Sequence, residues 1–341
     1  MHTLTLKDCS FIQELPQNIC SINRLVHLDI HETQLTCLPR RLGKLNQLRT
    51  LPIFIRGGET DCRLAELGSL KLEGELQIKA LQRVTSVDEA KAAHMNEKCG
   101  IRILSLSWEF NPDKFDCVNI YQAEDVLQNL QPHNNLKELE IHCYVGRSFP
   151  HWIMNLSLSN LSRLTLRGCM CEKLPALGQL PRLEYLSFVE LPLIKQLGSD
   201  FYGGPNSFPV LDTRKLNHMI ELEEWCHVGD EQFLPSLHKL NLLYCPKLKE
   251  LLSNFPSVTI LTMNVDDKLL LSSLQNDAFP NLTEIRVHYF DVFEEQVPEI
   301  QTDLSALIMY KRKLEGRTEV IPFGMLFVAV VQLIILISGL C

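Results

Sequence analysis

Leucines and other apolar residues alternate with polar ones in short stretches that recur along the chain. The repeated pattern is L-x-x-L-x-L-x-x-C, with threonine or another residue at the last position; clear copies end at Cys9, Thr33, Cys169, Cys245 and Phe290. Each alternating stretch predicts a short β-strand. A further copy is needed at 211–219 to keep the spacing, which makes about twelve units. The central apolar residues are Leu4, Leu28, Leu51, Leu76, Leu104, Leu139, Leu164, Leu186, Leu240, Leu261 and Ile285.

The spacing of these strands predicts the fold class. The average interval is about 25.5 residues, within the 20–29 residues of leucine-rich repeats. Alternate side chains of each strand point inward, so the leucines of successive units stack into one core. We therefore expect an α/β solenoid, a leucine-rich-repeat horseshoe with a parallel β-sheet on its concave face. Irregular or short helical segments would form the convex side.

Two long intervals predict helices. Residues 86–98 begin with Ser86, and Glu89 follows at the spacing of a capping box. In the segment 120–133, four apolar residues share one helical face. They are Ala123, Val126, Leu127 and Leu130.

Arg214 breaks the pattern, because it stands where an apolar strand residue is expected. A charged side chain at a core position is costly unless it is paired. We therefore expect the unit at 211–219 to be distorted or out of register.

The composition of the chain limits the classes of function that it can have. The 341 residues include 33 basic and 41 acidic ones, so the net charge is −8. That balance argues against a nucleic-acid partner, which needs a basic excess. The 12 cysteines are scattered, as in a reducing compartment. We expect the small residues in the turn after the strand to sit inside and bond to the loop backbone; they are Cys9, Thr33, Cys169 and Cys245. Cys169 and Cys171 have no second pair at zinc spacing, so no metal site is predicted.

The C-terminal segment is strongly apolar. Residues 320–341 carry no charge, and Lys311, Arg312, Lys313 and Arg317 precede them. About 20 apolar residues span a bilayer, and basic flanks stay on the cytoplasmic side. A transmembrane helix is one interpretation; a buried terminal segment, or a stretch outside the folded unit, is the other. The expected organisation is a solenoid over 1–290, a linker over 291–319 and a hydrophobic tail over 320–341.

Longer stretches carry a family resemblance. They include LGKLNQLRTLPIFIRG at 42–57, LQNLQPHNNLKELEI at 127–141, CEKLPALGQLPRLEYL at 171–186, ELEEW at 221–225 and LYCPKLKEL at 243–251. In this order, the chain resembles the leucine-rich-repeat region of plant coiled-coil nucleotide-binding disease resistance proteins. The resemblance covers about 1–290. It implies a protein-recognition module of innate immunity.

The chain also departs from that family. No G-x-x-x-x-G-K-[ST] motif occurs; the Gly43-Lys44 pair is followed by Leu45. The nucleotide-binding domain and coiled coil are therefore missing from this sequence, and we expect no ATP binding by the chain itself. We interpret it as a truncated relative or a fragment of a longer gene product.

No catalytic pattern is present. His31-Glu32 lacks the second histidine of H-E-x-x-H, and no G-x-S-x-G occurs. The chain is thus predicted to be no enzyme and to need no cofactor. The outward positions of the strands are the candidate protein-binding surface, because the core does not need them. The candidates are Asp29, His31, Glu140, His142, Arg167, Tyr185, Lys239, Asn241, Arg286 and His288.

The resulting function hypothesis is a cytoplasmic module that binds a pathogen effector or a host partner on its concave face in defence. The resemblance also implies restraint of a nucleotide-binding domain, here in trans. One alternative is a scaffold or receptor anchored to a membrane by residues 320–341. Another is a non-functional fragment of a resistance gene.

Overall fold

The computed structural model describes residues 2–58, 60–109, 120–154, 157–204, 206–225, 234–249, 251, 255–264, 278–288 and 300–303. The chain forms two compact units. Unit 1 comprises residues 1–183 and 191–193, and unit 2 comprises residues 184–190 and 194–341.

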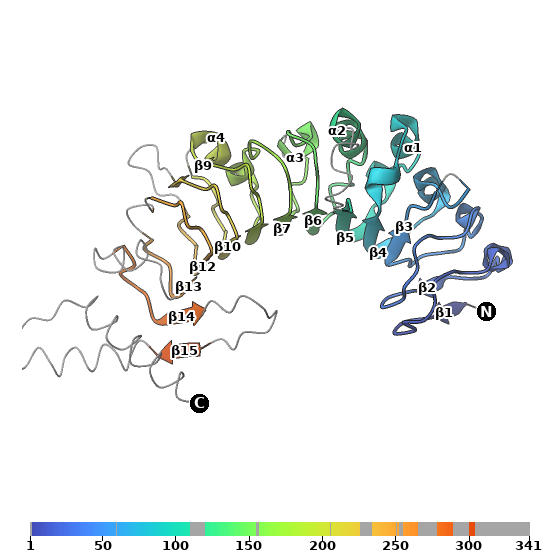
Figure 1. Cartoon of the computed structure of the whole chain (residues 1–341), viewed down its shortest axis with the longest axis horizontal. Helices are drawn as coiled ribbons and strands as arrows, with labels where there is room; N and C mark the ends of the chain where they lie inside the picture. Colours follow the sequence, from blue (N-terminus) through green and yellow to red (C-terminus); the bar gives the residue numbers. More distant parts are fainter. Residues whose placement is uncertain are drawn as a thin grey trace, which may run out of the picture. The chain divides into compact units, whose positions relative to one another are not determined.

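Unit 1 is a stack of parallel strands in chain order (Figure 1). The first two form a separate pair, in which Leu4 aligns with Leu28. The strands are β1 (Thr3–Thr5), β2 (His27–Asp29), β3 (Ile53–Ile55), β4 (Glu73–Lys79), β5 (Gly100–Ser107), β6 (Glu138–His142) and β7 (Arg163–Arg167).

Unit 2 repeats the arrangement. Its parallel strands are β8 (Tyr185–Val189), β10 (Thr213–Asn217), β12 (Lys239–Leu243), β13 (Ile260–Asn264) and β14 (Glu284–His288). The last of these also pairs antiparallel with β15 (Ile300–Asp303), which lies within the predicted linker. Behind these strands, β9 (Gln196–Leu197) pairs with β11 (Glu224–Trp225).

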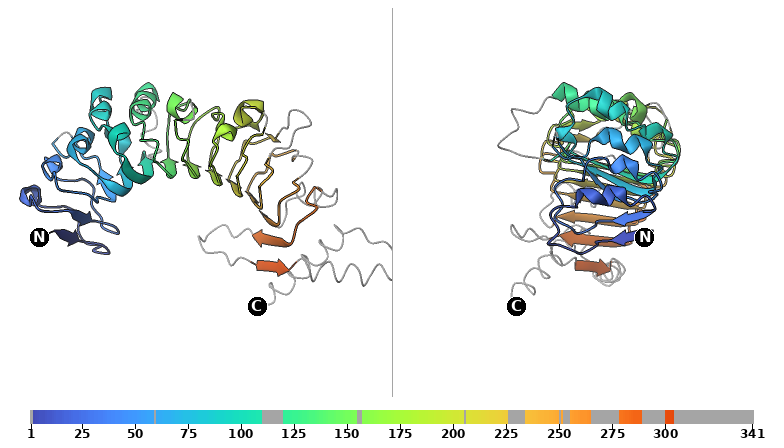
Figure 2. Two further views of the ribbon diagram at one scale, coloured as in Figure 1. Left: turned by 180° about the vertical axis from the view of Figure 1, so that it is seen from behind. Right: turned by 90° about the vertical axis from the view of Figure 1, so that its right-hand side faces the viewer.

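Helices lie on the side of each unit opposite to the strands (Figures 1 and 2). The α-helices are α1 (Val87–Lys91), α2 (Ile120–Asn129), α3 (His151–Met154) and α4 (Ser199–Tyr202). The 3-10 segments within the described residues are Gln17–Ser21, Leu42–Lys44, Leu64–Ser69, Leu81–Arg83, Met95–Glu97 and Leu177–Gln179.

The predicted leucine ladder is confirmed within both units. In unit 1, the strands align Leu76, Leu104, Leu139 and Leu164, and all four side chains are fully buried. In unit 2, Leu240, Leu261 and Ile285 align in the same way. The leucine-rich-repeat solenoid fold predicted from the sequence therefore holds for each unit.

The assignment at Leu51 agrees with one neighbouring repeat and not with the other. A bridge pairs His27 with Thr50, so Leu51 keeps the register of Leu28, and its side chain is fully buried. Taking Leu51 and Leu76 as equivalent would place Ile53 opposite Ile78, but β3 aligns Phe54 with Ile78. The register therefore shifts by one residue between these two repeats, where the carbonyl of Pro52 accepts from the backbone N–H of Gln77 at 2.7 Å.

The expected distortion at Arg214 is also wrong. This residue aligns with Leu186 and Leu240 in the regular register of β10. Its side chain is fully buried, with the guanidinium 4.3 Å from the ring centroid of Trp225 and 5.0 Å from that of Phe201. Cation–π contacts thus replace the missing leucine and leave the backbone undisturbed. Burial lowers the pKa of Arg214, while Tyr202 opposes that shift.

A left-handed residue ends most strands, which the sequence did not reveal. Glycine favours this conformation, whereas other residues pay about 1–2 kcal/mol for it. It recurs four residues after the central inward position, so the chain leaves the sheet at an equivalent point in each repeat. The residues are Asp8, Glu32, Ala80, Cys143, Gly168, Glu190, His218 and Tyr244.

Of the four turn residues that were predicted to sit inside and bond to backbone, three have a backbone carbonyl partner and one of these is fully buried. The Cys169 thiol is buried and lies 3.5 Å from the carbonyl oxygen of Ile141, in the preceding repeat. The Thr33 hydroxyl donates to the carbonyl of Ile30, and the half-buried Cys245 lies 3.6 Å from that of Leu243. Cys9 is an exception, because it is exposed. No preceding strand pairs with β1 in the described part of the chain, so nothing there covers this turn.

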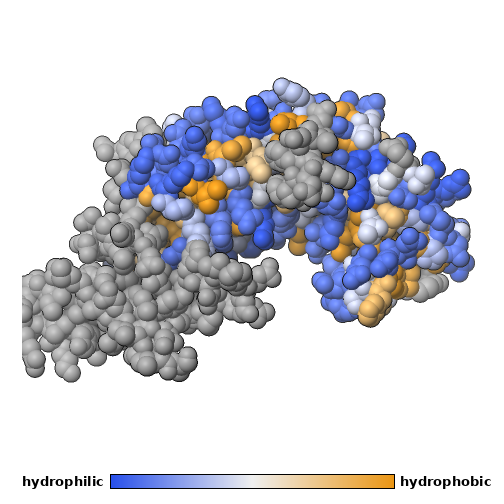
Figure 3. Space-filling view, in the orientation of Figure 1, coloured by the Kyte–Doolittle hydropathy of each residue, from blue (hydrophilic) through white to orange (hydrophobic). Residues whose placement is uncertain are grey.

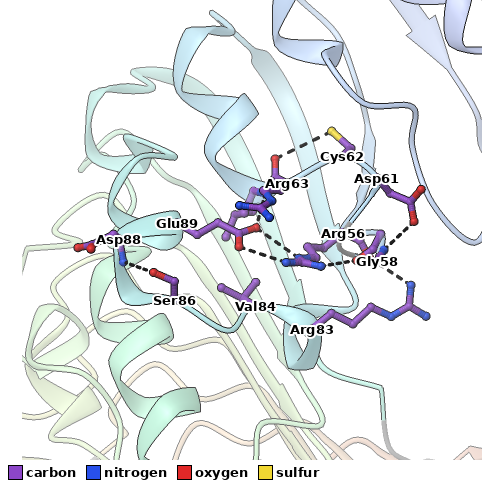
Figure 4. Close-up of polar contacts among 12 residues, drawn as sticks. Arg56, Gly58, Asp61, Cys62, Arg63, Arg83, Val84, Ser86, Asp88 and Glu89 are labelled. Atoms are coloured by element: carbon purple, nitrogen blue, oxygen red, sulfur yellow. Dashed lines mark hydrogen bonds and ion pairs between the residues drawn. The ribbon is translucent and has the colours of Figure 1, made fainter.

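Both predicted helices are present, although the first is short. The Ser86 hydroxyl accepts from the backbone N–H of Asp88 at 3.2 Å, as a helix cap should. Glu89 does not complete the capping box. Its carboxylate instead pairs with Arg56 at 3.2 Å and accepts from the N–H of Leu64 (Figure 4). In α2, the predicted face of Ala123, Val126, Leu127 and Leu130 is buried.

No helix in the described residues is long and apolar enough to cross a membrane. The hydrophobic tail 320–341 lies outside those residues, so its expectation stays a prediction. Apolar surface is visible over the first repeats of unit 1 (Figure 3), and Phe11 between β1 and β2 is 95% exposed.

Candidate protein-binding surface

The outward side chains of β4–β7 form the strand face of unit 1. The strand register places Gln77, Ser105, Glu140 and Thr165 side by side in one row. A second row contains Ser107, His142 and Arg167. Since the inward leucines make the core, this face is left to contact solvent or a partner.

Two pairs of polar side chains are in contact on the strand face of unit 1. The guanidinium of Arg163 lies 3.2 Å from the Glu138 carboxylate, and His142 Nε2 lies 3.1 Å from Glu140 Oε2. The hydrogen bond from His142 lowers the pKa of Glu140, against the effect of burial. Part of this surface therefore presents orientated pairs of side chains.

The same acid–histidine pairing occurs beside β2. Asp29 Oδ1 lies 2.7 Å from His31 Nδ1, and it also accepts from the backbone N–H of His31 at 3.1 Å. Burial raises the pKa of Asp29, but these bonds outweigh it and the net shift is downward. The two predicted candidates on this strand are thus in direct contact, and both are about one-third exposed.

The outward side chains of β8, β10, β12, β13 and β14 form the strand face of unit 2. One row contains Tyr185, Thr213 and Lys239, and the next contains Ser187, Lys215, Asn241, Thr262 and Arg286. The Lys215 ammonium lies 5.5 Å from the ring centroid of Tyr185. Arg286 bonds to Glu284 on its own strand at 2.8 Å.

The structure therefore divides the predicted residues into three groups. Asp29 and His31 lie at β2, Glu140, His142 and Arg167 lie on the strand face of unit 1, and the rest belong to unit 2. Tyr185, Lys239, Asn241 and Arg286 share the strand face there. His288 belongs to β14, but its side chain lies outside the described part of the structure.

Three outward positions that were expected to face solvent are buried. Ser105, Ser187 and Thr262 are each at most 5% exposed. Their side chains are short, and longer neighbours on adjacent strands cover them; Ser105, for example, lies between Gln77 and Glu140. The alternation of apolar and polar residues predicts on which face of the sheet a side chain lies, but not how far the neighbouring side chains extend over it.

Lys215 is the residue of this surface that sequence reasoning missed. Its repeat has Arg214 at the leucine position, so the outward position that follows was not assigned. His218 and Tyr244 were missed as well, because the left-handed turn was not recognised. Their rings lie 4.4 Å apart between centroids at neighbouring strand ends. Equal spacing from Leu186 and Leu240 could have identified all three.

Cysteines and carboxylates are candidate ligands for a metal ion. The described residues contain no group of three or more histidine, cysteine, aspartate or glutamate side chains that could hold an ion. Burial raises the pKa of Cys171 to about 12, and that of Cys169 is raised as well. A thiol with a raised pKa is a poor nucleophile at neutral pH.

Comparisons with known proteins place these features in context. A family model described as R13L1/DRL21 LRRs matches residues 64–191. A putative disease resistance protein of Arabidopsis thaliana is 34% identical over 252 residues, covering 70% of this chain and 18% of that protein. The putative disease resistance protein RGA1 of Solanum bulbocastanum is 33% identical over 249 residues, covering 71% and 24%. The chain thus spans less than a quarter of the length of these relatives.

Among solved structures, an internalin of Listeria monocytogenes has a TM-score of 0.45 and 13% identity, over 86% of this chain and 83% of that one. The assignment of the repeat fold rests on the strand registers of the chain itself and on the matched family.

Proposed function

Because residues 64–191 belong to the R13L1/DRL21 leucine-rich-repeat family and the chain is similar to plant disease resistance proteins, we propose that it recognises a protein partner in plant defence. The partner is a pathogen effector or a host protein, and a nucleotide-binding domain acting in trans is a second class of partner. Binding takes place on the strand faces and involves no chemistry on the partner.

One observation carries this proposal. The outward rows hold charged, amide and aromatic side chains in register on neighbouring strands, while the buried leucines of the same strands build the core. Such side chains can vary without loss of the fold, and tyrosine and arginine are frequent among residues that dominate binding energy. A rigid parallel sheet also holds them in fixed positions, which limits the entropy lost on binding.

Co-purification from plant tissue tests the proposal, with each unit probed by its own variant. We expect Glu140→Ala/Arg167→Ala in unit 1 or Tyr185→Ala/Lys239→Ala in unit 2 to remove partners that the parent chain retains. The matched control is Lys91→Ala/Lys173→Ala, at exposed positions away from the strand faces. An identical partner list for all four chains would refute binding at the strand faces.

The location of the chain is a separate proposal. The cytoplasmic side is favoured by the scattered cysteines and the basic residues before the tail. Fractionation of the full chain beside a chain ending at residue 319 distinguishes a membrane anchor from a tail that has no such role. Recovery of the full chain in the soluble fraction would exclude the anchor.

A further inference from the structure

The strand face of unit 2 carries three basic side chains, Lys215, Lys239 and Arg286. On unit 2, Arg286 is paired with Glu284. Lys215 and Lys239 remain, and within the described residues neither ammonium group has a carboxylate within 4.0 Å. Two unneutralised positive charges thus lie on one face of a chain whose net charge is −8.

The register places these two lysines next to each other. Lys239 aligns with Thr213, and Lys215 aligns with Asn241, so the lysines are diagonal neighbours on β10 and β12. Diagonal neighbours have Cα atoms about 7–8 Å apart, which long side chains bridge. Like charges at this separation repel each other, and a carboxylate between them would interact with both. Lys239 is exposed and Lys215 half-buried, so both can be reached.

The surroundings suit an acidic segment of a protein. The ring of Tyr185 lies beside Lys215 and offers contact area, and Asn241 and Thr213 supply hydrogen-bonding groups in the same rows. The nearby acid Asp212, directly before β10, is engaged by His238 at 3.0 Å and by the Thr213 hydroxyl. Neither lysine has this carboxylate within 4.0 Å.

We propose that the strand face of unit 2 binds an acidic segment of its protein partner, with Lys215 and Lys239 contacting Asp or Glu carboxylates of that segment. This proposal rests on the proposed function, because it specifies the chemistry of a partner that binds there. Two lysines without counter-charges on a rigid sheet form a preorganised site, since the protein has already met the cost of holding them together.

The test uses defined peptides with the full chain. A labelled peptide of four Glu-Glu-Ser repeats, its Gln-Gln-Ser counterpart and a twelve-nucleotide thymidine strand are titrated by fluorescence anisotropy at low salt. We expect the glutamate peptide to bind at least ten-fold more tightly than the glutamine peptide. We expect Lys215→Gln/Lys239→Gln to weaken this binding at least five-fold and to reduce its dependence on salt.

The control is Lys71→Gln/Lys173→Gln, which removes the same charge from exposed positions outside this face and should change the affinity less than two-fold. Thermal melting checks folding; the variant without Lys215 and Lys239 should melt no lower than the parent, because a repulsion is removed. Equal effects of the two variants, no preference for glutamate, or tighter binding of the oligonucleotide would each overturn the proposal.

The result is distinguishable from failure of the proposed function. If co-purified partners depend on Tyr185 and Lys239 while the glutamate peptide shows no preference, only the acidic partner is refuted. If the strand-face variants retain every partner, recognition by these faces is refuted as well.

Discussion

Units 1 and 2 form the same ladder of parallel strands, but different kinds of side chain stabilise the segments that pack behind the strands. In unit 1, acidic or amide side chains of one repeat accept from backbone N–H groups of its neighbour. Glu66 accepts from Arg41 and Gly43, Glu124 from Arg147 and Ser148, and Gln128 from His151.

Unit 2 uses aromatic packing in the corresponding place. Phe201, Tyr202 and Phe208 pack edge to face or tilted against one another, with centroids 5.2–5.9 Å apart. Trp225 donates from Nε1 to the Tyr202 hydroxyl at 2.6 Å, and Arg214 fills the space between the rings. The ladder fixes only the inward face of the strands, so either kind of support is compatible with one repeat fold.

The largest effect is expected where the polar support of unit 1 is most buried. Glu89→Ala leaves Arg56 without its partner at 2% exposure, and breaking a buried ion pair costs about 3–5 kcal/mol. Urea denaturation followed by tryptophan fluorescence measures the loss. Arg56→Met/Glu89→Leu replaces the pair by apolar groups and should recover most of it. The control is Glu97→Ala, at an exposed position. If it lowers the free energy of unfolding as much as Glu89→Ala does, the buried ion pair does not account for the loss.

A second buried cation of unit 1 gives a dependence on pH. Lys98 is 6% exposed and donates to the carbonyls of Leu67 and Leu70, and burial lowers its pKa to about 8. Between pH 8 and 10.5 the unfolded chain holds a proton that the folded chain has released, so stability rises with pH across this window.

This gain in the free energy of unfolding amounts to about 3 kcal/mol from the shift of the pKa. Lys98→Met should lose this part of the pH dependence and retain the rest. A parallel pH dependence of parent and variant would show that Lys98 titrates normally.

Arg214→Met tests the aromatic support of unit 2. The guanidinium is fully buried, and no carboxylate within 4.0 Å pairs with it in the described part of the chain. Replacing such a charge by an apolar side chain of similar length should raise the free energy of unfolding by about 1 kcal/mol. Trp225 fluorescence reports the unfolding of this region. A loss of stability of that size would show that the cation–π contacts outweigh the cost of burial.

The smallest effect is expected on the strand face of unit 1. Because the pKa of Glu140 is lowered in the folded chain, its contribution is present above the unfolded value and is lost as the pH falls through the folded one. Since the Glu140 side chain is about one-third exposed to solvent, we expect less than about 1 kcal/mol. Acid titration of the parent beside Glu140→Gln measures it, with Glu97→Gln as the exposed control. Coincident acid transitions in all three chains would contradict a role for the pair with His142.

Much of the strand ladder could be predicted, and part of the surface. Leucine spacing predicted the inward rows around Leu104, Leu164 and Leu261, and alternation then predicted outward residues such as Arg167 and Asn241. It failed at Pro52, where the register shifts by one residue, and at Arg214, where the repeat was intact despite its sequence. Lys215 was missed for the same reason, although it lies in the same row as Asn241.

The sequence by itself determined the repeat, since period and alternation are local properties that hydrophobic burial translates directly into strands and a core. Only the tertiary structure decided which polar groups support that core and which remain unpaired. The sequence predicted that Glu89 caps a helix, whereas in the structure Glu89 pairs with Arg56, 33 residues away in the chain. Such choices depend on distances between repeats, and those distances exist only once the strands have stacked.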